Sequence, residues 1–366
     1  MTVAQGGSRL VKRAIGLMSG TSLDGIDAAL IETDGVTAVR RGAALTLPFD
    51  TALRSDLKAC LGGGGDVPAT AHRLTLLAGE AVGRLLGRAG MKPDDIDVIG
   101  FHGQTIVHRP AEGLTWQIGN GALLAEATGI DVVCDFRSRD MASGGEGAPL
   151  APLYHAALAA ALDRSPVCIL NVGGVANVTW IGDGKLIAFD TGPGGALLDD
   201  WTLARTGEPF DRDGGLAARG KPCHDRVTAV FHNNPWFDRP PPRSLDRDAI
   251  AIDLAGLSTA DGAATLVDLT AEAVEHARRF MPRDPMMWIV CGGGRRNRHL
   301  VAALQHRLAP QVRVAEDVGW DGDSLEAEAF AYLAVRSLAG LPLSQPSTTG
   351  CREPVTGGAY HRVRQA

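Results

Sequence analysis

The chain has 366 residues, 45% of them hydrophobic, and its 36 basic and 42 acidic side chains give a net charge of −6. This length predicts two domains, and the negative charge disfavours a nucleic acid or an anionic membrane as partner. No apolar run approaches the ~20 residues of a membrane-spanning helix, and residues 1–13 lack the apolar core of a signal peptide. Six scattered cysteines without a CxxC pair favour buried thiols in a reducing compartment. We therefore expect a cytoplasmic protein.

A polar, glycine-rich stretch at residues 20–27 lies between two short apolar segments near the N-terminus. This pattern predicts a strand, a tight turn and a second strand. The backbone N–H groups and the hydroxyls of Thr21 and Ser22 suit phosphate oxygens, and the carboxylates of Asp24 and Asp27 suit a hydrated divalent cation. An ordinary hairpin turn explains the same residues, so this stretch alone leaves both interpretations open.

Helical and strand patterns alternate along the next hundred residues. Apolar side chains recur at helical intervals over 72–90, which predicts an amphipathic helix. A strand over 96–101 then delivers His102-Gly-Gln-Thr105 at its C-terminal end, where ligands bind in open α/β sheets. His102 in such a place suits a hydrogen bond or a substrate contact better than a metal ligand. The long glycine-rich loop at 139–149 is of a kind that is usually functional or disordered.

The pattern restarts at residue 163. A strand over 167–172, a glycine turn and a strand over 175–181 repeat the plan of the opening hairpin, although the two copies share little sequence. The predicted organisation is a flexible leader at 1–13, an N-terminal domain at 14–162, a C-terminal domain at 163–340 and an irregular tail at 341–366.

Three predicted strands run into glycine turns, at 16–27, 171–177 and 291–294. Glycine allows a ligand to approach the backbone closely, and the third turn leads into a helix whose N-terminus favours anions. Glycine turns are also common in a chain with 46 glycines. The fingerprints of P-loop NTPases and Rossmann dehydrogenases are absent from the sequence.

Asp190 is the strongest candidate for a catalytic carboxylate. It follows an apolar strand and precedes Thr-Gly-Pro-Gly194, which would hold the backbone open to a ligand. Such a carboxylate can accept a proton from a nucleophile, although an aspartate that caps a turn is a real alternative. Arg137, Arg139 and Asp140 flank the glycine-rich loop, where an arginine can bind a carboxylate or phosphate bidentately or only solvate the loop.

These motifs, in this order, resemble the anhydro-N-acetylmuramic acid kinase family over residues 14 to about 340. The segments that carry the resemblance are Gly16–Asp27, Phe101–Thr105, Gln117–Asn120, Asp135–Arg137, Gly144–Leu150, Asn171–Gly174, Phe189–Gly194, Asp211–Gly214 and Cys291–Gly294. The resemblance implies the actin/hexokinase/Hsp70-like ATPase superfamily, in which two ribonuclease-H-like α/β domains surround a central nucleotide cleft. It also implies a homodimer.

The resemblance further implies a reaction and a set of roles. Water attacks the anomeric carbon of 1,6-anhydro-N-acetylmuramic acid and the freed O6 takes the γ-phosphate of ATP, in the recycling of cell-wall amino sugars. Asp190 would be the base for the water, and Glu326 a second active-site carboxylate. ATP would contact Gly20, Thr21, Ser22, Leu23, Asp24, Gly25, Ile26, Asp27, Asn171, Gly173, Gly174, Gly292, Gly293 and Gly294. Mg²⁺ would be held by Asp24 and Asp27, and the sugar by His102, Gln117, Asn120, Arg137 and Asp140.

The chain departs from the family pattern at a few positions. Glu146 stands where relatives usually have glutamine, Gly195 stands where asparagine often follows the glycine-proline motif, and residues 319–324 also differ. None of these removes the expected base or phosphate turn. Two alternative functions remain open: a kinase of another sugar that phosphorylates a plain hydroxyl, and a non-catalytic binding protein switched by ATP.

Overall fold

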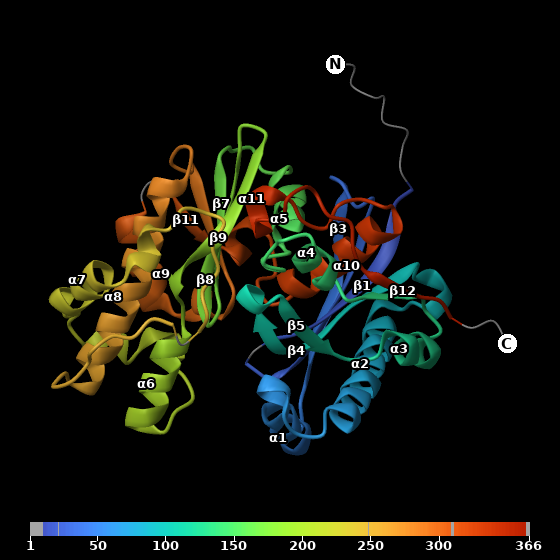
Figure 1. Ribbon diagram of the computed structural model, residues 1–366, viewed down its shortest axis with the longest axis horizontal. Coiled ribbons are helices and arrows are strands. Elements are labelled where there is room, and N and C mark those ends of the chain that lie inside the picture. The colour runs from blue at the N-terminus through green and yellow to red at the C-terminus, as the bar shows by residue number, and fades with distance from the viewer. Residues whose placement is uncertain (1–9, 21, 248, 309–310, 364–366) are drawn as a thin grey trace. The chain divides into compact units, whose positions relative to one another are not determined.

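The computed structural model describes residues 10–20, 22–247, 249–308 and 311–363, and it confirms the α/β class (Figure 1). The chain forms two compact units. Unit 1 comprises the described residues up to Ala161 together with those from Ser324 onward, and unit 2 comprises those of Leu162–Asp323. None of the helices in the described ranges is both long and apolar enough to cross a membrane.

Unit 1 is built on a sheet with the strand order β12-β6-β4-β1-β2-β3, and β5 pairs with β4. Its strands are β1 (Lys12–Ser19), β2 (Gly25–Thr33), β3 (Val39–Pro48), β4 (Val98–Arg109), β5 (Leu114–Ile118), β6 (Val132–Cys134) and β12 (Ala359–His361). β1, β2 and β3 form an antiparallel meander, and β4 lies parallel to β1, with β6 parallel to β4. This is the ribonuclease-H-like order that the resemblance implies.

Seven α-helices belong to the described residues of unit 1. They are α1 (Thr51–Cys60), α2 (Val67–Ala89), α3 (Gly121–Thr128), α4 (Ser138–Ala142), α5 (Pro152–Ala159), α10 (Leu325–Leu338) and α11 (Pro346–Thr349). α2 packs on β2 and β3, and it contains most of the helix predicted over 72–90. It begins earlier than predicted because the side chain of Asp66 accepts a hydrogen bond from the N–H of Ala69, and it ends at Gly90 in the left-handed conformation.

Helix α10 packs against β1, β2 and β4 of unit 1. A Cβ atom on Gly16 would lie 1.7 Å from the carbonyl oxygen of Ala327, and one on Gly100 would lie 2.1 Å from that of Phe330. The helix therefore rests directly on the backbone of two neighbouring strands. This grouping differs from the predicted C-terminal domain at 163–340, because residues from Ser324 onward belong with unit 1.

The ends of the chain also differ from expectation. Lys12 and Arg13, assigned to the leader, are part of β1, while residues 1–9 lie outside the described residues. The tail expected to be irregular contains α11 and also β12, which pairs with β6. Long-range pairing of this kind leaves no periodic pattern in a short segment, so the sequence could not reveal it.

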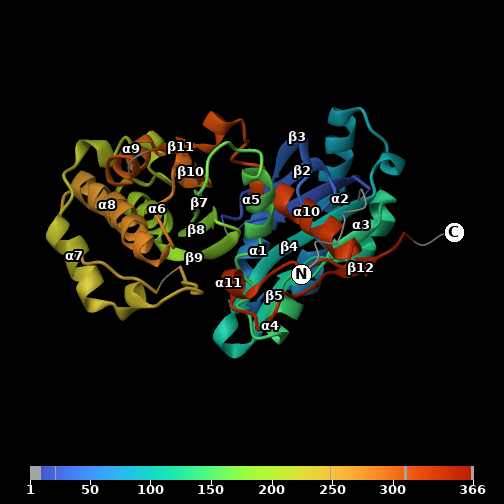
Figure 2. The same ribbon diagram turned by 90° about the horizontal axis from the view of Figure 1, so that it is seen from above.

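Unit 2 repeats the strand order of unit 1, as β11-β10-β7-β8-β9. Its elements are β7 (Val167–Val172), β8 (Val175–Gly182), β9 (Lys185–Pro193), β10 (Met287–Cys291), β11 (Val312–Val314), α6 (Ala196–Thr206), α7 (His224–Asn233), α8 (Thr259–Ala277) and α9 (Arg298–Arg307). β7 to β9 form an antiparallel meander, and β10 lies parallel to β7. Helices α8 and α9 lie side by side (Figure 2), and α8 packs on β9.

Candidate active site

The glycine turn of unit 1 connects β1 to β2. Within it the N–H of Leu23 donates to the carbonyl of Gly20 at 3.3 Å, with Leu23 at φ 52°, and the hydroxyl of Ser22 donates to Asp24 at 2.9 Å. Asp27 lies inside β2, where it accepts a hydrogen bond from Thr46 at 2.5 Å. The strand, turn and strand predicted here are confirmed. Thr21 lies outside the described residues.

The carboxylates of Asp24 and Asp27 were expected to hold Mg²⁺. Across the described ranges, no group of three or more His, Cys, Asp or Glu residues could hold a metal. Mg²⁺ bound with a nucleotide commonly needs only one or two carboxylates, because phosphates and waters complete its coordination. Two carboxylates are therefore compatible with the expected role of Asp24 and Asp27, and Mg²⁺ at these residues stays a prediction.

His102 lies inside β4, not at the end of a strand as predicted. β4 follows β1 as far as Gln104 and then continues as the partner of β5, and Gly103 at φ 73° lies at this transition. The buried imidazole bonds through Nδ1 to the carbonyl of Gly103 at 2.8 Å, and its Nε2 accepts from Arg137 at 2.9 and 3.1 Å. Burial, with the charge of Arg137, holds the pKa of His102 well below its usual value.

Arg137 connects His102 to the glycine-rich loop. Its Nη1 donates to the carbonyl of Gly147 at 2.7 Å while its other donors face His102. Burial lowers the pKa of Arg137 to about 10, and the negative charges of Glu326 and Asp140 act in the opposite direction. The guanidinium is therefore a fixed cation that lies within electrostatic reach of two carboxylates.

Asp140, expected to bind the sugar, is surrounded by protein donors, and a sugar contact for it stays a prediction. The residue is buried, and its carboxylate accepts from the hydroxyls of Ser344 and Thr349 and, at 2.7 Å, from the N–H of Gly147. These contacts tie the glycine-rich loop to the C-terminal segment. Ser344 and Thr349 were not identified from the sequence, and Pro346, a typical first residue of a short helix, was the only local signal.

Gln117 and Asn120, the other candidate sugar contacts, lie in and just beyond β5. Gln117 donates to the hydroxyls of Thr105 and Thr115 at 3.1 and 2.8 Å. The side-chain oxygen of Asn120 accepts from the N–H of Leu123 and caps α3. Both residues thus have a structural task, and a sugar contact for either stays a prediction.

Glu326 lies in the first turn of α10 and is exposed. The same helix brings Phe330 against the ring of His102, with 4.5 Å between ring centroids. Together with the electrostatic reach between Glu326 and Arg137, this brings three of the predicted residues of unit 1 into one neighbourhood: His102, Arg137 and Glu326.

In unit 2, two glycine turns lie side by side because β7 and β10 are paired. Cys291 is in register with Asn171, so Gly292 follows directly beside Asn171. Gly292 has a φ of 72°, and a Cβ atom added to it would lie 2.3 Å from the side-chain oxygen of Asn171. The structure thus brings Asn171, Gly173 and Gly174 together with Gly292, Gly293 and Gly294 at one edge of the sheet.

Asp190 lies inside β9, three residues before the strand ends, and not after the strand as predicted. It pairs with Asn177, whereas the next pair is Gly192 with Ala176, so Thr191 forms a bulge. The turn beyond β9 is bonded to the β7–β8 turn: the N–H groups of Gly194 and Gly195 donate to Gly174 and Gly173 at 2.9 and 2.7 Å. The half-buried Asp190 is therefore attached, through its own strand, to the glycine turns of unit 2.

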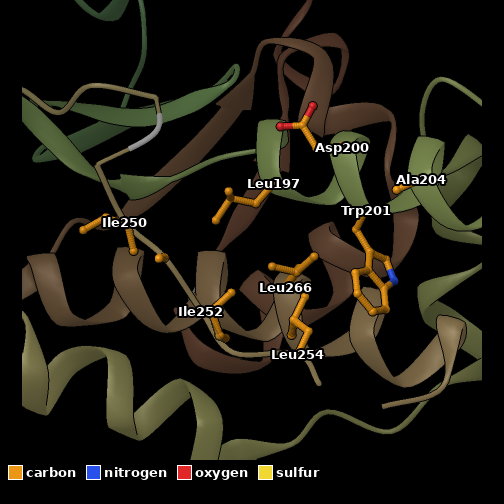
Figure 3. Close-up of a pocket in the computed structure, with 9 residues that line it drawn as sticks. Leu197, Asp200, Trp201, Ala204, Ile250, Ile252, Leu254 and Leu266 are labelled. Carbon is orange, nitrogen blue, oxygen red and sulfur yellow. The ribbon is translucent and has the colours of Figure 1, made fainter. Parts of the chain in front are cut away.

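Unit 2 also contains a cavity of about 440 Å³. Figure 3 shows its mainly apolar lining, which comes from α6, α8 and the segment between α7 and α8. The lining residues are Leu197, Asp200, Trp201, Ala204, Ile250, Ala251, Ile252, Leu254 and Leu266. None of the predicted site residues is among them.

Comparison with known proteins decides the family. The model of the family described as anhydro-N-acetylmuramic acid kinase matches residues 12–362. The protein of that name from Paramagnetospirillum magneticum is 55% identical over 353 residues, which cover 95% of this chain and 99% of the relative. The chain belongs to the anhydro-N-acetylmuramic acid kinase family. A Rhodospirillum rubrum protein of the same name is 51% identical over 355 residues, covering 95% and 93% of the two chains.

Two departures from the pattern expected of the anhydro-N-acetylmuramic acid kinase family can be placed in the structure. The N–H of Glu146 donates to the carbonyl of Thr349 at 2.7 Å, so the backbone of this half-buried residue is fixed whatever its side chain. Gly195 contributes only its backbone, which bonds to Gly173. Neither substitution disturbs the contacts of Asp190 or Arg137 described above.

Proposed function

We propose that this chain phosphorylates 1,6-anhydro-N-acetylmuramic acid with ATP and opens the anhydro ring by hydrolysis. The observation that supports this best is the carboxylate of Asp190, held in β9 beside the linked glycine turns of unit 2, in a chain that belongs to the anhydro-N-acetylmuramic acid kinase family. A general base and a nucleotide site are the two components that such a reaction needs.

In this proposal Asp190 accepts a proton from the attacking water. The new bond forms between that water oxygen and C1, and the bond between C1 and O6 breaks. O6 then bonds to the γ-phosphorus of ATP while the bond from that phosphorus to the β–γ bridging oxygen breaks, which gives N-acetylmuramic acid 6-phosphate and ADP. The glycine turns contribute backbone N–H groups that suit phosphate oxygens. Mg²⁺ held by Asp24 and Asp27 would neutralise the phosphate charge.

The sugar is proposed to contact unit 1. Arg137 is a fixed cation, and a guanidinium suits the lactyl carboxylate of the substrate. His102, which is neutral, holds Arg137 in place and so acts on the sugar through it. Glu326 is proposed as the second active-site carboxylate, and Gln117 and Asn120 as further contacts of the sugar.

The setting of this reaction is also a proposal. The product would serve the recycling of cell-wall amino sugars in the cytoplasm, and the six cysteines of the chain are all free thiols, which fits a reducing compartment. The family resemblance suggests a homodimer.

The decisive experiment measures ADP release with ATP, Mg²⁺ and one sugar at a time. We expect turnover with the anhydro-sugar and little with N-acetylmuramic acid or N-acetylglucosamine. In H₂¹⁸O the product should gain one labelled oxygen at C1, because the ring opens by attack of water. Phosphorylation without incorporation of the label would instead indicate plain transfer to a hydroxyl.

The role of Asp190 has its own test. Asp190→Asn keeps the size of the side chain but removes the base, so we expect sugar phosphorylation to fall by at least about 10³-fold while the affinity for ATP changes little. Unchanged turnover in this variant would remove Asp190 from the mechanism. ATP binding without turnover of any sugar by the wild-type protein would favour the non-catalytic alternative.

A further inference from the structure

One segment outside the predicted site makes three hydrogen bonds to Asp190. The N–H of Asp190 donates to the carbonyl of Arg243 at 3.1 Å, and Nε of Arg243 donates to the carbonyl of Asp190 at 3.0 Å. The N–H of Leu245 donates to the carboxylate oxygen Oδ2 of Asp190 at 2.8 Å. Residues 243–245 thus fix both the backbone and the side chain of the proposed base.

Arg243 is itself held rigidly. Its side chain is only 2% exposed, and its Nη1 donates to the carbonyls of Phe237 and Arg239 at 2.8 Å each. These acceptors lie in and just after the short helix η6 (Pro235–Asp238). The rings of Trp236, Phe280 and Phe189 surround the guanidinium, with centroids 4.4, 4.8 and 5.4 Å from Cζ. A planar guanidinium group with this many fixed partners has little freedom to move.

A purely structural role explains this arrangement poorly. A buried guanidinium is costly to desolvate, and apolar residues of similar volume often replace buried charges without loss of stability. Here Nη2 has no hydrogen-bond partner among the described residues. The hydrogen bonds that its side chain does make connect the carbonyls of the η6 segment to a single residue of the sheet, Asp190.

We propose that Arg243 is a positioning residue that holds Asp190 in its reactive orientation by clamping β9 to the segment around η6. This rests on the proposed function, because it assumes that Asp190 is the base. Arg243 touches no reacting atom. Its effect passes through the backbone of Asp190 and through Leu245, whose N–H orients the carboxylate.

The test compares Arg243→Lys with Arg279→Met. Lysine keeps the charge, but its single nitrogen cannot occupy the positions of both Nε, which donates to Asp190, and Nη1, which donates to the two η6-segment carbonyls. Arg279 is the matched control, because it donates to the carbonyl of Phe237 at 3.0 Å and forms an ion pair with Asp238, yet makes none of the hydrogen bonds to Asp190 described above. Loss of Arg279 loosens the same short helix without removing the clamp.

We expect Arg243→Lys to lower kcat by about 30- to 100-fold, since a shift of ~1 Å in a reacting group has an effect of this size. The KM values for ATP and the sugar should stay within about threefold, and Arg279→Met should keep kcat within about threefold. The proposal would be overturned if Arg243→Lys kept the wild-type kcat, or if Arg279→Met lowered kcat as much as Arg243→Lys. It would also be overturned if Arg243→Lys raised only the KM for ATP and left kcat unchanged.

Amide hydrogen exchange separates this proposal from the proposed function. Peptides that contain Asp190 and Leu245 should exchange at least about tenfold faster in Arg243→Lys than in Arg279→Met, whether or not the protein acts on the anhydro-sugar. If the wild-type protein fails to turn over this sugar, the proposed function falls while the exchange result still tests the clamp. Equal exchange in the two variants would show that Arg243 does not hold Asp190.

Discussion

Arg137 donates two hydrogen bonds to Nε2 of His102, at 3.1 and 2.9 Å, and this makes His102 a neutral imidazole. Because Nε2 accepts, the ring proton lies on Nδ1, which donates to the carbonyl of Gly103. A protonated His102 would bring a second cation against Arg137. The pair therefore forms a fixed unit in which the histidine orients the arginine.

The first prediction follows from this neutral state. Burial and Arg137 depress the pKa of His102 in the folded protein, so the unfolded chain binds more protons at this site as the pH falls through about 6.5. The free energy of unfolding should therefore decrease below pH 6.5. In His102→Gln this part of the decrease should be missing, as measured by urea denaturation between pH 7.5 and 5. If the free energy of unfolding fell more steeply with decreasing pH in His102→Gln than in the wild type, the neutral state of His102 would be contradicted.

Two glutamates of α10 make a matched pair for the second prediction. Glu328 is buried and bonds to Arg41, to Tyr154 and to Ser324, whereas Glu326 is exposed. Removing one partner of a buried ion pair leaves an uncompensated charge, so Glu328→Gln should lower the free energy of unfolding by about 3 kcal/mol.

Glu326→Gln should lower turnover and leave the stability of the protein almost unchanged. We expect its free energy of unfolding to change by less than about 0.5 kcal/mol, as for most surface substitutions, while turnover of the anhydro-sugar falls. Chemical denaturation and steady-state kinetics of both variants check this. Equal stability losses in the two variants would mean that Glu326 is a structural residue.

The features that the sequence predicted well are those carried by short, continuous motifs. The turn that follows Gly20, the repeated plan after residue 163 and the turns at Asn171 and Gly292 all follow from apolar strands that end in glycine. The sequence did not predict that the last two turns are neighbours, because this depends on the pairing of β7 with β10. The place of Asp190 on an apolar strand that runs into glycines follows from the same pattern, although β9 continues past it. Its role as the base stays a prediction.

The features that were missed depend on contacts between distant segments. Nothing local shows that α10 packs on Gly16, that Ser344 binds the carboxylate of Asp140, or that Arg243 bonds to Asp190. The sequence around Arg243 is rich in proline and arginine and carries no helix or strand pattern. An arginine among aromatic residues is a weak hint of burial, because such a sequence is equally compatible with an exposed loop.

The third prediction concerns Asp199, in the first turn of α6 beyond the glycine turn. Burial, helped by the charges of Asp200 and Asp211, raises its pKa to about 6, against the effect of Arg247. A carboxyl group with a raised pKa stabilises the folded state below its unfolded pKa, and this contribution is lost as the pH rises through 6. The stability of Asp199→Asn relative to wild type should therefore increase between pH 4.5 and 7.5.

The last prediction tests the close packing of α10. In Gly16→Ala the new methyl group would lie 1.7 Å from the carbonyl oxygen of Ala327 and 2.6 Å from the N of Ala331, so helix and strand must separate. Overpacking costs ~1–3 kcal/mol even where side chains can move, and here both neighbours are backbone. We expect a loss of at least about 3 kcal/mol in the free energy of unfolding, together with reduced turnover because Glu326 moves with the helix.

Gly83→Ala is the control for this prediction. Gly83 lies on the exposed side of α2, and a Cβ atom there would have nothing within 4 Å. Alanine at this position should stabilise the protein by ~0.5–1 kcal/mol. If Gly16→Ala were as stable as Gly83→Ala, the described contact between α10 and β1 would be wrong.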